Sequence, residues 1–195
     1  SEKILQATYL AFNEQKAAII RKLIHDKPSY NSIIIFSSTK KNVSNIVRAI
    51  KGNGYDVQAV SSDLNQADRE DALRKFRSKQ TRVLVATDVL ARGIDVKDVN
   101  LVINYDVPRD AEDYVHRIGR TARGDNTGVA LTFINADDCY NFSKIESLIG
   151  SEVTKRPLPE GFEEGPKYDT SKKKPFKKKG NFNNKKKKHW KPRKK

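Results

Sequence analysis

The distribution of apolar residues is the feature that most limits how this 195-residue chain can fold. Short runs rich in β-branched residues recur along its first three quarters. Continuous apolar runs of this length, without a clear apolar–polar alternation, are typical of strands buried on both faces of a parallel sheet. The runs lie at 4–11, 33–36, 57–60, 82–86, 101–105 and 129–134.

Helical patterns separate these runs. Their apolar residues recur at i, i+3, i+4 and i+7, which gives each helix one apolar face. The patterns follow Asn13 and Asn65, span 43–50, start near Asp110, and span 136–149. This βαβα order predicts an α/β fold with a mostly parallel central sheet and helices on both faces. Ligands meet such sheets at the carboxyl ends of the strands, so we expect functional residues in the loops that follow them.

Charge divides the chain unevenly. Residues 167–195 hold 15 of the 39 Lys and Arg residues and a single acid, Asp169, so they carry +14 of the net charge of +15. The apolar periodicity fades after residue 150. We therefore predict a domain at 1–150, a linker at 151–166 and a disordered, lysine-rich tail at 167–195, because the tail has too little apolar surface to fold.

The tail combines cations with aromatic residues. Lysines bind phosphate backbones, and Phe176, Phe182 and Trp190 are suited to stacking on unpaired bases. This pattern predicts a tail that binds a polyanion, for which RNA, DNA and an anionic membrane are the alternatives, and a merely solubilising tail is a further alternative.

Composition also argues against several protein classes. The single cysteine, Cys139, excludes an internal disulfide and a multi-cysteine zinc site, and no apolar run is long enough to span a bilayer. We expect a cytoplasmic protein without membrane attachment. The opening Ser1-Glu2-Lys3 has no secretory signal and runs into a strand pattern as if cut from a longer protein.

The densest cluster of candidate functional residues is the string HRIGRTAR at 116–123, which follows the short helix predicted near Asp110. Its cations are His116, Arg117, Arg120 and Arg123. A guanidinium placed beside a γ-phosphate stabilises the charge that develops during phosphoryl transfer. The alternative is a solvated basic face that pairs with nearby acids.

Three other segments offer groups that bind phosphate or ribose. The string TDVLARGID at 87–95 follows a strand, FSSTKKN at 36–42 joins a strand end to a helix, and QADR at 66–69 opens another helix. Hydroxyls and free backbone N–H groups at such positions favour anions. An ordinary turn in the first segment and helix capping in the second are the alternatives.

Together these segments resemble the motifs of the C-terminal RecA-like domain of superfamily 2 helicases, and HRIGRTAR narrows the resemblance to the DEAD-box RNA helicases. The resemblance covers residues 1–150 and implies a RecA-like three-layer sandwich. There are two departures: Ser61-Ser62 stands where the family commonly has His-Gly, and Ala122-Arg123 stands where it often has Gly-Arg.

The resemblance implies a role for each matching residue. Arg120 and Arg123 match arginine fingers that reach ATP held by a separate N-terminal RecA-like domain, while His116 and Arg117 belong to the motif that couples hydrolysis to strand separation. Asp95 matches the acid that contacts the nucleotide ribose and the fingers. RNA-backbone contacts are implied for Ser38, Thr39, Arg69, Thr87 and Gly93. Contacts of this kind predict binding that is largely independent of RNA sequence.

Two elements of the family's ATP site do not occur in the sequence. There is no G-x-x-x-x-G-K-[ST] phosphate loop and no Asp-Glu-Ala-Asp string. The resemblance therefore implies that ATP and Mg²⁺ are held by the absent N-terminal domain, that this chain binds no metal and that it does not hydrolyse ATP alone. We expect RNA and that domain as partners, and a monomeric protein.

Two other functions are weighed against the helicase. An ATP-independent RNA tether or annealing module is favoured by the tail, but a tether has little use for a pair of arginine fingers. A DNA-unwinding relative is disfavoured by the HRIGRTAR string.

Overall fold

The computed structural model describes residues 4–88, 96–121 and 127–172, and these form a seven-stranded parallel sheet. Its order is β3-β4-β2-β5-β6-β1-β7. The strands are β1 Ile4–Leu10, β2 Ile33–Ser37, β3 Val57–Val60, β4 Val83–Thr87, β5 Leu101–Asn104, β6 Gly128–Ile134 and β7 Thr154–Arg156. All strand pairs are parallel. The predicted parallel α/β architecture is confirmed.

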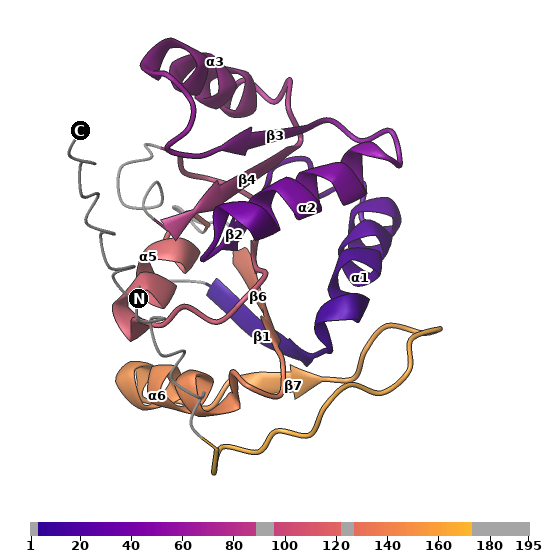
Figure 1. The fold of residues 1–195 in the computed structure, drawn as a ribbon, viewed down its shortest axis with the longest axis vertical. Helices are drawn as coiled ribbons and strands as arrows, with labels where there is room; N and C mark the ends of the chain where they lie inside the picture. The colour runs from indigo at the N-terminus through magenta and orange to yellow at the C-terminus, as the bar shows by residue number, and fades with distance from the viewer. Residues whose placement is uncertain (1–3, 89–95, 122–126, 173–195) are drawn as a thin grey trace, which may run out of the picture.

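The described helices cover both faces of this sheet (Figure 1). They are α1 Asn13–Asp26, α2 Lys40–Lys51, α3 Gln66–Arg77, α5 Ala111–Ile118 and α6 Cys139–Ile149. Three begin at a side-chain cap, because Thr39, Asn65 and Asp110 accept hydrogen bonds from backbone N–H groups of the first turn. None of the helices in the described ranges is both long and apolar enough to cross a membrane.

Burial on both faces explains why the central strands lack alternation. Every residue of β2, β4 and β5 is buried. In β2, Ile33 and Ile35 pack with α1 and α2, whereas Ile34 and Phe36 pack with α3 on the opposite face. A third apolar cluster joins β6 to α5 and α6. The result is a three-layer sandwich.

The segment after α6 differs from the linker expected at 151–166. Residues 154–156 form β7, which pairs with β1 and extends the sheet. We call residues 157–172 the C-terminal strap. Its Leu158 and Phe162 pack against the core beside α1, and its Tyr168 packs beside α6. Isolated apolar residues without periodicity therefore dock onto the domain rather than form an element of their own.

A partly buried carboxylate fastens the strap. Glu146 of α6 accepts hydrogen bonds from the Val153 N–H (2.8 Å), Lys155 Nζ (2.6 Å) and the Tyr168 hydroxyl (2.5 Å). Burial by itself would raise the pKa of Glu146, but the hydrogen bonds from Lys155 and Tyr168 hold it below its ordinary value. These contacts join α6, β7 and the strap into one unit.

Gly165 provides a test of this docking. A Cβ at this position would lie 1.9 Å from the carbonyl oxygen of Leu10. We expect Gly165→Ala to lower the free energy of unfolding by about 1–3 kcal/mol, the usual cost of overpacking, as measured by chemical denaturation. Gly52→Ala is the matched control, because its Cβ would meet only ordinary contacts, at 3.5 Å or more, in right-handed helical backbone. Equal stability of the two variants would show that the strap is not docked as described.

Candidate functional site

Three central strands end at the same edge of the sheet. Ser37, the last residue of β2, is in register with Thr87, the last residue of β4. On the other side of β2, Phe36 is in register with Asn104, the last residue of β5. Parallel pairing therefore brings together the loops that follow these strands, as the sequence predicts for an α/β fold.

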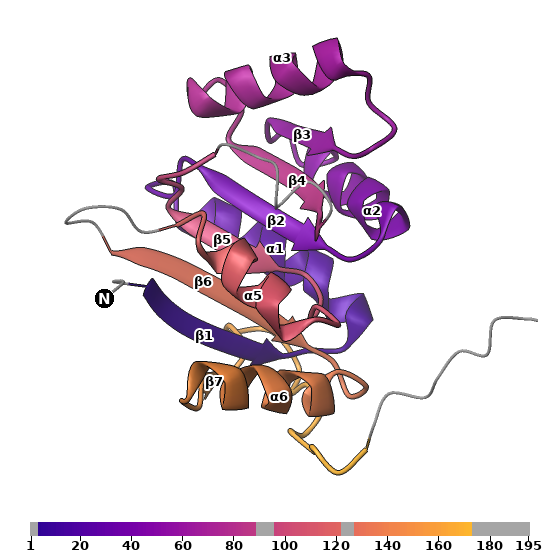
Figure 2. The ribbon, with the colours of Figure 1, turned by 90° about the vertical axis from the view of Figure 1, so that its left-hand side faces the viewer.

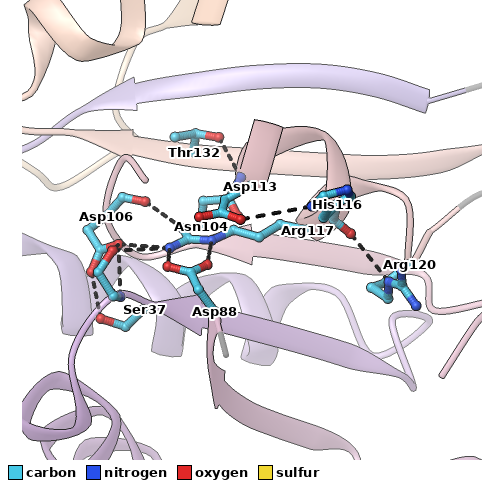
Figure 3. A network of polar contacts seen from close by, with 10 residues as sticks. Ser37, Asp88, Asn104, Asp106, Asp113, His116, Arg117, Arg120 and Thr132 are labelled. Carbon is cyan, nitrogen blue, oxygen red and sulfur yellow. Dashed lines mark hydrogen bonds and ion pairs between the residues drawn. The ribbon is translucent and has the colours of Figure 1, made fainter. Parts of the chain in front are cut away.

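Arg117 of α5 joins these loops (Figure 3). Its side chain is completely buried. The Nε and Nη2 atoms donate to Asp88 at 2.5 and 2.8 Å, Nη1 donates to the Asp106 carbonyl at 2.8 Å, and Nη2 also lies 3.2 Å from Asp106 Oδ1. The Ser38 hydroxyl accepts from Nη2 at 3.2 Å. One guanidinium thus holds residues that follow β2, β4 and β5.

Asp106 is the second centre of the network. Its carboxylate accepts from the Ser37 hydroxyl at 2.6 Å, and from the backbone N–H and the hydroxyl of Ser38 at 2.9 and 2.8 Å. Burial alone would raise the pKa of Asp106, but Arg117 and these hydrogen bonds outweigh it and hold the pKa below its ordinary value. Burial alone would likewise lower the pKa of Arg117, but its hydrogen bond to Asp88 raises the pKa above its ordinary value. Both groups therefore stay charged.

The side chains of His116 and Arg120 are more exposed than that of Arg117, although all three residues lie on the same short segment. The His116 side chain is 47% exposed, and its Nδ1 lies 3.9 Å from Asp113 Oδ1. Arg120 is half-buried, and its Nε donates to the His116 carbonyl at 3.3 Å. The next residue, Thr121, is buried and donates its hydroxyl to the Val99 carbonyl at 2.6 Å. The end of α5 is therefore fastened on both sides of Arg120.

The two hydroxyl residues after β2 have different roles in the structure. Thr39 is the N-cap of α2 and accepts from the Asn42 N–H at 3.2 Å, so helix capping accounts for its position. Ser38 is instead held by Asp106 and Arg117, and it is exposed. Ser38 is thus the hydroxyl of this loop that belongs to the polar network.

The remaining predicted residues lie around this network or outside the described residues. Thr87 is buried at the end of β4, directly before Asp88. Arg69 is in the first turn of α3, and its buried Nε has no hydrogen-bond partner in the described part of the chain. Gly93, Asp95 and Arg123 lie outside the described residues.

The sequence motifs assign no role to three polar residues at these strand ends, Asp88, Asp106 and Asn104. Asp88 and Asp106 both bond to Arg117, which the family resemblance assigns to coupling rather than to a buried ion pair. Asn104 is also buried and donates to the Thr132 hydroxyl at 3.0 Å. The available signal is position: each of these residues ends a buried strand or follows one within two residues, where a polar group needs a partner.

Comparisons with known proteins identify the family. A family model described as "Helicase conserved C-terminal domain" matches residues 15–125, more than half of the chain. The chain is 40% identical over 138 residues to the ATP-dependent RNA helicase eIF4A of Debaryomyces hansenii, and 41% identical over 124 residues to eukaryotic initiation factor 4A of Caenorhabditis elegans. These matches cover 71% and 64% of this chain, but 35% and 31% of the relatives. The chain thus spans about a third of their length.

Solved structures show the same relationship. The C-terminal domain of the DEAD-box protein Dbp5 has a TM-score of 0.72 and 33% identity, with 79% of this chain and 90% of that chain covered. The Escherichia coli DEAD-box protein SrmB, solved bound to regulator of ribonuclease activity A, has a TM-score of 0.76 and 29% identity, covering 86% and 99%. This chain belongs to the DEAD-box RNA helicases, as a C-terminal domain. The fold is the RecA-like sandwich that the resemblance implies.

In this DEAD-box domain, the end of α5 carries one cation that is enclosed in the network and two that are not. Arg117 is enclosed and uses its donors on protein acceptors, so it cannot reach a ligand without breaking them. His116 and Arg120 lie on the exposed side of the same helix end. The geometry thus suits Arg117 to positioning, and its neighbours to contact with a ligand or another domain.

We expect Asp106→Asn to destabilise this DEAD-box domain by about 3 kcal/mol at neutral pH, because it leaves the buried Arg117 partly uncompensated. The folded-state pKa of Asp106 lies below the ordinary value of 3.8, so its stabilising effect is complete above that value and is lost as pH falls through the folded-state pKa. Urea unfolding of both proteins between pH 7 and 2.5 should show the stability gap narrowing in acid. A constant gap would contradict this role of the carboxylate.

Proposed function

We propose that this domain is half of an ATP-dependent RNA helicase, in which it binds the RNA backbone and supplies arginine fingers to ATP on an N-terminal RecA-like domain. The observation that carries the proposal is the arrangement at the end of α5, where buried Arg117 anchors the helix while the neighbouring His116 is exposed and Arg120 is half-buried. The relatives named ATP-dependent RNA helicases support the same activity.

In this proposal Arg120 and Arg123 stabilise the charge that develops on the γ-phosphate, and Asp95 contacts the ribose. The ATP and its Mg²⁺ lie on the other domain, since this sequence has neither the phosphate loop nor the acidic string that would hold them. Domain closure would complete the site. His116 would contact the other domain, while Arg117 would act as a positioning residue.

The edge of the sheet where β2, β4 and β5 end would bind RNA. Ser38 is exposed beside the network, Arg69 opens α3 with its Nε unpaired within the described residues, and Thr87 ends β4. Together with Thr39 and Gly93, they would contact phosphate and sugar, which are common to all RNA sequences. Local separation of short duplexes would follow from closure on one strand.

The cellular setting is part of the proposal as well. We expect a monomeric, cytoplasmic helicase whose partners are RNA and the N-terminal RecA-like domain. A tether or annealing module remains the second candidate function, favoured by the lysine-rich sequence from residue 167 onward.

We predict that Arg120→Ala in the two-domain protein lowers RNA-stimulated ATP turnover by at least ~10²-fold at matched RNA occupancy, because a finger of this kind contributes ~10³ or more in rate. RNA affinity should stay unchanged. Arg48→Ala is the matched control, since Arg48 is an exposed arginine at the far end of α2, and the isolated chain should show no turnover. Unchanged turnover in Arg120→Ala would favour the tethering function, and turnover by the pure isolated chain would contradict a composite ATP site.

We also predict that deletion of residues 173–195 lowers RNA affinity and makes that affinity less sensitive to salt concentration. Each phosphate that the tail neutralises contributes about 0.7 to the slope of log affinity against log salt for a single strand. Turnover at saturating RNA should be preserved, because Arg120 and the strand ends are intact. An unchanged salt slope would identify the tail as a solubilising segment.

A further inference from the structure

Lys16 of α1 is a buried cation that the proposed function does not use. Its side chain is only 1% exposed, although lysine is rarely enclosed in this way. Its Nζ donates to the backbone carbonyl of Tyr105 at 2.7 Å and lies 4.7 Å from the centre of the Tyr105 ring. A buried ammonium is costly unless it is well compensated, so its location calls for a reason.

Tyr105 lies between β5 and the polar network. Its N–H donates to the Phe36 carbonyl at 2.8 Å, which continues the pairing of β5 with β2 by one residue. The next residue is Asp106, which holds Ser37, Ser38 and Arg117. A shift of the Tyr105 carbonyl would therefore move Asp106 and its partners.

The two consecutive carbonyls of this segment are held by cations from opposite layers. Lys16 reaches the Tyr105 carbonyl from the α1 side of the sheet, where Tyr105 packs. Arg117 reaches the Asp106 carbonyl at 2.8 Å from the side of Phe36, whose ring lies 5.9 Å from its guanidinium. The loop after β5 is thus fastened from both faces of the sheet.

We infer that Lys16 is a positioning residue for the proposed RNA-stimulated ATPase. It holds the Tyr105-Asp106 backbone so that Asp106 keeps Ser38 and Arg117 in place, and with them α5, which ends two residues before Arg120. This inference rests on the proposed function only for its effect on turnover. The effect on Ser38 is independent of any catalytic role.

The decisive variant is Lys16→Met, which has a similar volume and removes the charge and the donor. A side chain that only filled the core would be replaced by methionine without consequence. Lys155→Met is the matched control, because Lys155 is a largely enclosed lysine that donates to Glu146, far along the sheet from Asp106. Lys16→Arg keeps a cation and its donors.

The first measurement is amide hydrogen exchange of Ser38 in this chain, followed by NMR, since the Ser38 N–H donates to Asp106. We expect exchange at Ser38 to accelerate by about tenfold in Lys16→Met, to stay at the wild-type rate in Lys155→Met, and to change less in Lys16→Arg. Wild-type exchange at Ser38 in a folded Lys16→Met would overturn the inference. If Lys16→Met does not fold, the same comparison is made with Lys16→Arg. Wild-type exchange at Ser38 in Lys16→Arg would then support the inference. Faster exchange at Ser38 despite the retained cation would overturn it.

The second measurement is RNA-stimulated turnover of the two-domain protein. We expect Lys16→Met to lower kcat by about tenfold, less than the ~10²-fold that a full 1 Å misplacement can cost, while the KM for ATP stays within about twofold because ATP lies on the other domain. Lys155→Met should match wild type. Equal kcat in wild type and Lys16→Met would overturn the predicted effect of Lys16 on turnover. An absence of RNA-stimulated turnover in wild type would overturn the proposed function instead, and the exchange rate of Ser38 would then decide the role of Lys16.

Discussion

The buried ion pair of Arg117 with Asp88 is the interaction on which the rest of the site depends. A guanidinium enclosed by the domain must have all its donors satisfied, and here Asp88, Asp106 and Ser38 satisfy them. These acceptors follow three different strands, so the charge can be compensated only if β2, β4 and β5 end in register. Fold and site are therefore coupled: the sheet positions the acceptors, and Arg117 joins them to α5.

This coupling suits the proposed function, in which the domain completes its site with another domain. Arg120 would then meet a partner surface at a defined position, which requires that α5, whose C-cap Gly119 directly precedes Arg120, be fixed before the domains close. Arg117 supplies this rigidity from within, and Thr121 supplies it from the next turn through the Val99 carbonyl. In the proposed function, His116 and Arg120 would then need little reorganisation on closure.

Sequence periodicity was sufficient for the fold because both faces of the sheet are covered. The runs at 33–36, 82–86 and 101–105 became β2, β4 and β5 within one residue at each end, and the helix predicted after Asn65 begins there, with Asn65 as its cap. β7 was missed because Thr154–Arg156 has three residues, two of them cations, and no apolar pattern. The strap was missed for a related reason, since its anchors Phe162 and Tyr168 dock singly.

The site was harder to predict because charge alone does not reveal burial. His116 and Arg117 are adjacent cations, yet the first is 47% exposed and the second completely buried. Only the position of Arg117 relative to Tyr114 and Ile118, both buried on α5, indicates that it faces inward. Lys16 gave the same signal, because it lies three and four residues before the buried Ile19 and Ile20. A cation on the apolar stripe of a helix therefore indicates a buried acceptor.

The position of the C-terminal strap matters for the tail that follows it. Cys139 opens α6 five residues after β6, its Sγ contacts the Lys167 carbonyl at 3.7 Å, and Figure 2 shows this end of α6 at the edge where the strands end. In the proposed function RNA lies along this edge of the sheet, so a tail that follows the strap would act on the same RNA molecule at high effective concentration.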